Sequence, residues 1–182
     1  MEKIMKSNEF IKEQKKNFPI KKDGKTYWVS RSIAVLGLVI AERGGEHYIL
    51  VNKRGDGCPD FNGMWNIPCG YLDYNETTKE AVSREIWEEC GVRIEPSAFA
   101  LHSINDDPNE GESQNVTIRY VARVPESVMD IPLNNGNSET DEVDGIMWMN
   151  VNDIENYDWA FNHRFLLRNI LTNFNIFPRV SK

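Results

Sequence analysis

The chain has 182 residues, which is enough for one well-buried domain and too few for two ordinary ones. Its composition, 40% apolar and 27% charged residues, is typical of a soluble globular protein. The formal net charge of −7 argues against a broad basic surface that would hold nucleic acid, although metal ions could still offset the charge of a small anionic substrate.

The chain is expected to form an N-terminal arm followed by a single domain. Residues 1–20 are polar and predict a partly helical arm, and residues 21–182 are expected to form one domain, because no linker or internal repeat interrupts them. The Lys-Lys-Asp-Gly-Lys sequence at 21–25 indicates a turn before a short strand at 26–29.

The next elements are the strands expected at the centre of the sheet. Residues 33–41 are rich in β-branched residues and almost continuously apolar, which predicts a strand covered on both faces. A turn at 43–46 leads to a hairpin partner at 47–52. Residues 54–70 then form a loop rich in Gly, Pro, Asp and Asn, in which Trp65 and Ile67 are expected to pack inward.

A helix follows this loop and has signals at both ends. Thr77 and Glu80 have the three-residue spacing of a capping box, and Gly91 supplies a C-terminal stop. The helix also has an apolar side that a neighbouring sheet can cover, formed by Ala81, Val82 and Ile86.

The second half of the chain alternates strands with long connections. The apolar pattern predicts strands at 98–104, 116–124 and 146–149. A closing helix is expected at 161–174, with Phe165, Leu166, Ile170 and Phe174 on its buried side. Strands around two substantial helices indicate one α/β domain. Loops as long as 105–115 and 125–145 are more often functional than idle in a fold of this size.

Three carboxylates gather on one side of the helix before Gly91. Glu85 precedes Glu88 by three residues and Glu89 by four, so all three side chains project from the same side. A solvated acidic face is the simplest reading of the helix by itself. Like charges at this spacing repel, however, and a divalent cation is the best candidate to gather them, because Mg²⁺ prefers carboxylate oxygens and shares its other positions with substrate phosphates.

The 23 residues from Gly70 to Val92 fill every fixed position of a known motif. Gly70, Glu76, the Arg84-Glu85-Ile86 triplet, the Glu88-Glu89 pair and Gly91-Val92 are all in register. The chain therefore resembles the Nudix hydrolases, whose Nudix box has this pattern. The resemblance implies an α/β Nudix fold, with a mixed β-sheet sandwiched between α-helices. It also implies hydrolysis of a nucleoside diphosphate linked to another moiety, with Mg²⁺ or Mn²⁺ as the cofactor.

The resemblance also implies roles for individual residues. Glu85 and Glu89 are the strongest expected metal ligands, and Glu88 is next. The backbone carbonyl before Gly70 is often a further ligand, and Cys69 supplies it here, where glycine is more usual. Glu76 is expected to pair with Arg84 and brace the loop, and is less favoured as a metal ligand.

The expected mechanism is attack on phosphorus by a water held at the carboxylate cluster, with a further carboxylate accepting its proton. Glu142 is the first candidate for this base, because it lies six residues before Trp148, an offset similar to that of a loop glutamate in the family. Glu139 in the same loop is the alternative, and a base within the box helix is a third possibility. Glu142, Glu88 and Arg84 are therefore the candidate catalytic residues.

The substrate is less well determined than the reaction. Pro108 lies close to a proline of ADP-ribose pyrophosphatases in the family, so ADP-ribose or a nucleotide sugar ranks first, ahead of nucleoside triphosphates and dinucleoside polyphosphates. The alternative from another class is a non-catalytic Nudix domain that senses a nucleotide and has a regulatory role. The expected partner is a small nucleoside diphosphate derivative, without nucleic acid or membrane. A homodimer is possible, because dimers are frequent in the family.

Aromatic and histidine residues have simpler interpretations. Trp65, Trp87 and Trp148 are expected in the core. Tyr27 and Trp28 are also expected to pack, although a strand near the site could present one of them for base stacking. The segment from Trp159 to His163 is similar to an Ala-Phe-Asp-His sequence of part of the family, but Asn162 replaces the aspartate, and a helix-start role is its simplest explanation.

The cysteines and apolar runs indicate the expected compartment. Cys58, Cys69 and Cys90 show no paired zinc spacing, and an odd number suits a disulfide framework poorly. The longest apolar run, 33–41, is too short to span a bilayer, and the N-terminal segment has no apolar stretch of signal-peptide length. We therefore expect unpaired thiols and a cytoplasmic protein.

Overall fold

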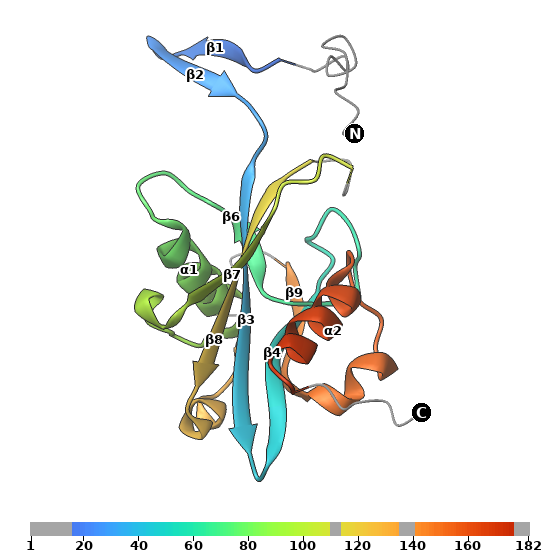
Figure 1. The fold of residues 1–182 in the computed structure, drawn as a ribbon. Helices are drawn as coiled ribbons and strands as arrows, with labels where there is room; N and C mark the ends of the chain where they lie inside the picture. Colours follow the sequence, from blue (N-terminus) through green and yellow to red (C-terminus); the bar gives the residue numbers. More distant parts are fainter. Residues whose placement is uncertain (1–15, 110–113, 135–140, 177–182) are drawn as a thin grey trace, which may run out of the picture.

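The computed structural model describes residues 16–109, 114–134 and 141–176. Its centre is a seven-stranded mixed sheet in which five strands lie in the order β5-β4-β3-β8-β7 (Figure 1). Strand β3 pairs in parallel with β8, and β6 pairs with β3 and β9 with β4 in antiparallel fashion. The strands are β3 (Ile33–Arg43), β4 (Glu46–Arg54), β5 (Trp65–Asn66), β6 (Cys69–Tyr71), β7 (Ala100–Asn105), β8 (Val116–Val124) and β9 (Val143–Asn150).

The two helices cover opposite faces of this sheet (Figure 1), α1 (Thr78–Cys90) on one face and α2 (His163–Asn173) on the other. Alternation along β3 explains the two layers, because successive side chains of a strand point to opposite faces. Val35 and Val39 of β3 belong to the buried cluster that contains α1, whereas Leu36, Leu38 and Ile40 belong to the cluster that contains α2. The fold is therefore the α/β sandwich that the sequence predicts.

Short 3₁₀ helices complete the domain. They are η2 (Pro96–Ala98), η3 (Glu126–Asp130) and η4 (Val151–Asn156). The loop predicted at 54–70 contains β5 and β6, and the connection predicted at 125–145 contains η3 and the start of β9. Strands β5 and β6 have little sequence signal of their own, because they form only where β4 and β3 offer them hydrogen bonds.

Helix α2 buries a different side from the predicted one. Leu166 and Ile170 are buried as expected, but Phe165 and Phe174 are exposed, and the rest of the buried stripe is His163, Leu167 and Leu171. Positions 163, 166, 167, 170 and 171 follow the i, i+3, i+4, i+7, i+8 pattern of a helix that packs one face on a sheet. The two phenylalanines lie off this stripe, so their large apolar side chains do not make them buried.

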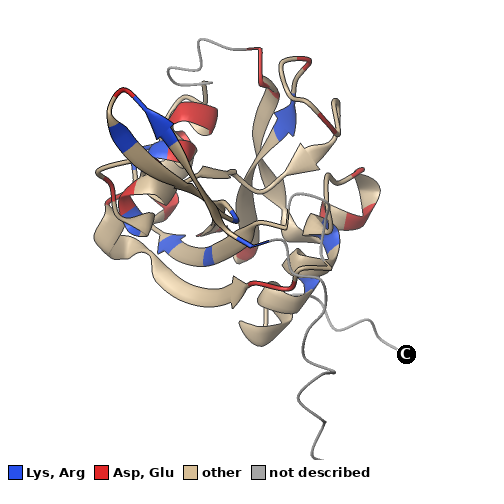
Figure 2. Cartoon of the chain, turned by 90° about the horizontal axis from the view of Figure 1, so that it is seen from above, with Lys and Arg blue, Asp and Glu red and all other residues tan. Residues whose placement is uncertain are grey.

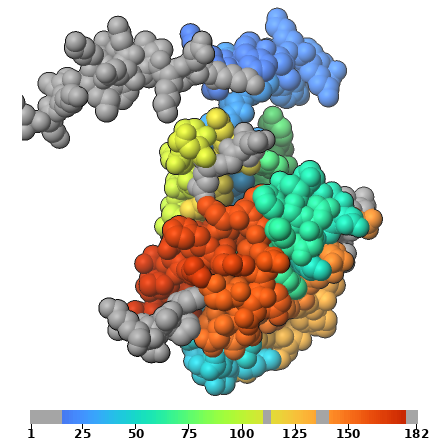
Figure 3. Space-filling model, turned by 90° about the vertical axis from the view of Figure 1, so that its right-hand side faces the viewer, coloured from blue at the N-terminus to red at the C-terminus, as the bar shows by residue number. Residues whose placement is uncertain are grey.

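The N-terminal part of the described chain forms a separate hairpin. Strand β1 (Phe18–Lys22) pairs with β2 (Lys25–Val29) in a two-stranded sheet that stands away from the domain (Figures 1 and 3). Most of the arm predicted at 1–20 lies outside the described residues, and β1 crosses its predicted boundary. Trp28 is 68% exposed, so the expectation that it packs in the core is wrong.

Charge is distributed over the fold without separation by sign. Figure 2 shows Lys and Arg segments interspersed with Asp and Glu segments. Among the described helices, none combines the length and the apolarity that crossing a membrane requires.

Candidate functional site

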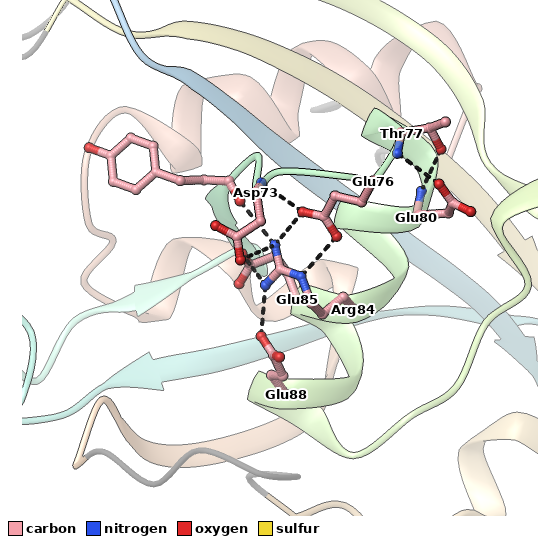
Figure 4. A network of polar contacts seen from close by, with 8 residues as sticks. Asp73, Glu76, Thr77, Glu80, Arg84, Glu85 and Glu88 are labelled. Carbon is pink, nitrogen blue, oxygen red and sulfur yellow. Dashed lines mark hydrogen bonds and ion pairs between the residues drawn. The ribbon is translucent and has the colours of Figure 1, made fainter. Parts of the chain in front are cut away.

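The helix that carries the three carboxylates is fixed at both ends. The Thr77 side chain accepts a hydrogen bond from the Glu80 backbone N–H, and the Glu80 side chain accepts one from the Thr77 N–H at 2.7 Å, as the predicted capping box requires (Figure 4). Gly91 ends the helix in the left-handed conformation, with φ 75°. The helix therefore begins and ends where its sequence predicts, and the carboxylates occupy fixed positions along it.

Arg84 is the centre of a network of polar contacts in the loop and helix (Figure 4). Its Nη2 and Nε donate to the two carboxylate oxygens of Glu76 at 2.8 and 3.0 Å, and Nη2 also donates to the Tyr71 carbonyl at 3.0 Å. Its Nη1 donates to Glu85 at 2.9 Å and to Glu88 at 2.8 Å. Glu76 thus lies where a brace for the loop between β6 and α1 is needed.

Glu85 lies against the backbone of the preceding strand. A β-carbon on Gly70 would overlap the Glu85 carboxylate in its present position, so a larger residue at this position would require the Glu85 side chain to move. Burial raises the pKa of the Glu85 carboxyl to about 7, although the neighbouring Arg84 acts in the opposite direction. The close approach of the Glu85 carboxylate to the backbone of β6 therefore uses the space that a β-carbon at residue 70 would occupy.

Glu89 is the most deeply enclosed of the three carboxylates. One of its oxygens accepts the Cys69 N–H at 3.1 Å, and the Asn52 side chain also bonds to it. Burial, followed by repulsion from Glu85, raises the pKa of Glu89 well above its ordinary value. Two carboxyl groups with raised pKa values on one helix form a site that a cation would stabilise in the charged form.

The donor set suits a hard divalent cation, but the side chains are not arranged around an ion. Among the described residues, no three His, Cys, Asp or Glu side chains stand in a metal-binding arrangement. The reason is that Arg84 holds Glu85 and Glu88, so both side chains would rotate to bind an ion. The buried Asn52 Oδ1 beside Glu89 has no hydrogen-bond partner and adds one more oxygen ligand to the set.

The segment that contains Glu142 is held against the loop after β4 through its backbone. The Glu142 carbonyl accepts the Gly55 N–H at 2.7 Å, and the Asp141 carbonyl accepts the Gly57 N–H at 2.8 Å. A β-carbon on Gly55 would overlap the Asp141 carbonyl, so the two segments approach closely only because residue 55 is glycine. The alternative base, Glu139, lies outside the described residues.

A cavity of about 1360 Å³ joins these groups. Glu85, Glu88, Glu89 and Glu142 all contribute to its lining, as do Asn52 and Cys69. Of the other predicted residues, Pro108, Tyr27 and Trp28 do not line it, whereas Trp65 and Trp148 pack beside the core as expected. The structure thus brings the box carboxylates and the candidate base to one cavity.

The cavity lining also includes residues for which the sequence predicts no functional role. Among them are Arg54 at the end of β4, Phe61 in the loop that follows, Phe161 before α2 and His163 at the first position of α2. Phe61 carries no motif, and His163 belongs to the Trp159–His163 segment, for which a helix-start role of Asn162 is the simplest explanation from sequence. The only available signal was the similarity of the Trp159–His163 segment to part of a known family.

Comparison with known proteins points to one family. The sequence model of the NUDIX domain matches residues 30–170. A MutT-like protein of Streptomyces ambofaciens is 41% identical over 64 residues, which cover 35% of this chain and 36% of that relative. The chain thus aligns with only about a third of the length of this relative.

Two solved structures show the same fold at low sequence identity. The NUDIX domain of Shewanella oneidensis NrtR, complexed with ADP ribose, has a TM-score of 0.68 and 17% identity, and covers 80% of this chain and 90% of that domain. NrtR has also been solved with a 27mer DNA. A bifunctional NMN adenylyltransferase/ADP ribose pyrophosphatase of Francisella tularensis, with AMP and a Mn ion, has a TM-score of 0.55, 20% identity and coverage of 80% and 42%.

Proposed function

The chain belongs to the Nudix family, and we propose that it is a metal-dependent pyrophosphohydrolase that cleaves the diphosphate of a nucleoside diphosphate derivative. The observation that carries this proposal is the placement of the three box carboxylates and Glu142 on the lining of one cavity. ADP-ribose or a nucleotide sugar is the proposed substrate class, supported by the ADP ribose bound to the NUDIX domain of NrtR.

Glu85, Glu89 and Glu88 would hold Mg²⁺ or Mn²⁺, with the Cys69 carbonyl and the Asn52 oxygen as further ligands. When bound, the ion neutralises the phosphates and lowers the pKa of a coordinated water. Arg84 donates to both Glu85 and Glu88 and balances their charge until the cation is present.

In the proposed reaction, Glu142 accepts the proton of the attacking water. Its side chain is exposed to the cavity, and its backbone is fixed to the loop at Gly55. A general base must lie within reach of its proton in the substrate complex, and a loop held by backbone hydrogen bonds provides this position. Glu88 is the alternative base on the helix itself.

Substitution of Glu89 tests the metal assignment. E89Q should retain the fold and lose turnover by about a hundredfold or more, because the amide cannot replace a charged ligand. The measurement is release of AMP or phosphate with Mg²⁺ or Mn²⁺ from ADP-ribose, NADH, deoxynucleoside triphosphates and diadenosine polyphosphates. E95Q is the matched control, because Glu95 is an exposed carboxylate outside the cavity lining. Undiminished turnover by E89Q would refute the assignment.

A second candidate function is nucleotide sensing without catalysis. Its support is the likeness to the NUDIX domain of NrtR, a protein that has been solved with DNA. The retention of all box carboxylates favours the hydrolase. Tight nucleotide binding without turnover of any substrate in the panel would favour the sensor.

A further inference from the structure

Arg31 lies in the short segment that joins the β1–β2 hairpin to β3 (Figure 1). The end of the sheet at which β3 begins contributes to the cavity lining through Ala34 of β3, Tyr71 of β6, Asn105 of β7 and Thr117 of β8. Arg31 itself belongs to no sequence motif and is not part of the lining. Any role of this arginine in the reaction is therefore exerted through other residues.

The Arg31 guanidinium bonds to three backbone carbonyls of the connection between β7 and β8. Nε donates to the Gln114 carbonyl, and Nη2 donates to the carbonyls of Asp106 at 2.9 Å and Asn115 at 3.3 Å. These carbonyls lie beyond the last residue pair of the β7–β8 ladder, on both strands. We call the three hydrogen bonds the Arg31 clasp. A guanidinium suits it, because its planar fork of donors can reach carbonyls on two strands at once.

The backbone that the clasp holds is in a strained conformation. Gln114 has φ 53°, in the left-handed region that a residue with a β-carbon rarely adopts. Strain of this kind persists only where the surrounding structure fixes the backbone. The Val116 N–H also donates to the Ser32 carbonyl at 2.9 Å, which joins the start of β8 to the segment that contains Arg31. The clasp is therefore one of the restraints that keep Gln114 in this conformation.

Asn115 connects the clasp with the cavity. It contributes to the lining, and its Nδ2 donates to the hydroxyl of Tyr71 at 3.2 Å. Tyr71 is 55% exposed, so this pair lies at the rim, where the cavity meets solvent. The backbone of Tyr71 is fixed independently, because β6 pairs with β3 and the Tyr71 carbonyl accepts Arg84 Nη2 at 3.0 Å. Loss of the clasp should therefore displace Asn115 and leave the box carboxylates in place.

We propose that Arg31 is a positioning residue, whose three hydrogen bonds fix Asn115 at the rim of the cavity, where the Asn115 amide contacts the bound substrate. The inference rests on the proposed function, because the rim has this role only when a ligand occupies the cavity. It assigns Arg31 to substrate binding and not to the chemical step, since the carboxylates do not depend on the clasp.

The test compares Arg31 with an arginine at the other end of the same strand. R31M removes the guanidinium. R43M is the matched control, because Arg43 ends β3, donates to the distant Glu126 carbonyl at 3.1 Å and lies outside the cavity lining. R31M should raise KM for the best substrate about tenfold with kcat within about twofold, because it removes binding that the ground and transition states share. R43M should keep both constants. Equal losses in the two variants, or a lower kcat at unchanged KM in R31M, would overturn the proposal.

R31K separates the geometry of the clasp from its charge. Lysine keeps the positive charge but has no donors in the fixed fork of Nε and Nη2. The KM of R31K should therefore be close to that of R31M. A wild-type KM in R31K would show that the charge alone is needed and would refute the clasp.

Removal of the Asn115 amide tests the route by which Arg31 acts. N115A should reproduce the increase in KM, and R31M combined with N115A should add little to it, because both changes remove one contact. If the two increases in KM multiply in the double variant, Arg31 does not act through Asn115.

Hydrogen exchange and calorimetry make the test independent of turnover. In R31M the amides of residues 115–117 should exchange faster than in the wild type, while those of β6 and α1 are unchanged. ADP-ribose titrated in the presence of EDTA should bind R31M about tenfold more weakly than the wild type and R43M. Faster exchange at unchanged affinity would show that Arg31 serves only the local structure. An inactive chain that shows both changes refutes only the hydrolase, and an active chain in which R31M changes neither refutes only the positioning role.

Discussion

Two ionisable side chains on the cavity lining, Glu89 and His163, are largely removed from water, and this desolvation acts against the charge of each. It raises the pKa of Glu89 well above its ordinary value and lowers the pKa of His163 to about 3. The two groups differ in whether a bound ion can restore their charge. A cation at the box would stabilise the charged form of Glu89, whereas His163 stays neutral.

The lowered pKa of His163 predicts a pH dependence of stability. Below its ordinary pKa of 6.5, the unfolded chain takes up a proton that the folded chain does not, so stability is lost as the pH falls from 6.5 toward 3. Relative to H163N, the wild type should lose about 1 kcal/mol of unfolding free energy between pH 6.5 and 5.5.

Urea unfolding of both proteins at pH 7.5, 6.5 and 5.5 measures this difference. The comparison must be between the two proteins, because Glu85 acts in the opposite direction. Its folded-state pKa is raised from 4.5 to about 7, so its contribution to stability increases as the pH falls through that range. Parallel pH profiles for wild type and H163N would show that His163 is protonated equally in both states.

At the residue scale, the sequence predicts those parts of the site that lie within one continuous motif. The spacing from Gly70 to Gly91 predicted the carboxylate side of α1 and its helix cap, and the resemblance to the Nudix box implied the pairing of Glu76 with Arg84. No such motif marks His163 or Phe61, because each contacts residues that lie far along the chain. Ile67, for example, lies 96 residues from the histidine whose tautomer it fixes.

At the scale of elements, the close contact between the loop after β4 and the residues just before β9 leads to a testable prediction. G55A should displace the Asp141–Glu142 backbone and lower kcat by about tenfold or more, because a methyl group has no room beside the Asp141 carbonyl. The assay is turnover of the best substrate at saturating concentration, with the melting temperature recorded in parallel.

G145A is the control for this loop. A β-carbon on Gly145 would meet its nearest neighbour, Lys53, at an ordinary 3.6 Å, so this variant alters β9 without moving Glu142. If Glu142 is the base, G55A should add little to the loss caused by E142Q, because both act on one group. If the losses of kcat caused by G55A and E142Q multiply in the double variant, the base is a residue other than Glu142.

The elements themselves were predictable in proportion to their length. Strands β3 and β8 and helix α1 have long periodic patterns or caps and were found within a few residues of their observed bounds. Strands β5 and β6 were not predicted, since two or three residues become a strand only through pairing with β4 and β3. The predicted buried face of α2 was wrong at Phe165 and Phe174, because burial follows the i, i+3, i+4 stripe of the helix and not the size of the residues.

At the scale of the whole molecule, the β1–β2 hairpin should behave as a unit apart from the domain. Within the described chain, its strands pair only with each other, and a two-stranded sheet is marginally stable by itself. Amide hydrogens of residues 18–29 should exchange within seconds, while those of β3 stay protected for hours. Hydrogen-exchange mass spectrometry of the full chain measures both; protection of the hairpin that rises with protein concentration would indicate that a second copy covers it.

The parallel pairing of β3 with β8 has a consequence for the order in which the chain acquires its site during synthesis. Ile33 pairs with Val116, which leaves the ribosome much later, and such distant contacts form slowly. The β3–β4 hairpin and α1 emerge early and already contain Val35, Leu50, Val82 and Ile86 for mutual burial. Phe161, His163 and α2 emerge later still. A nascent chain stalled before α2 would therefore carry the box carboxylates without the residues from Phe161 to Leu166 that complete the lining of the cavity.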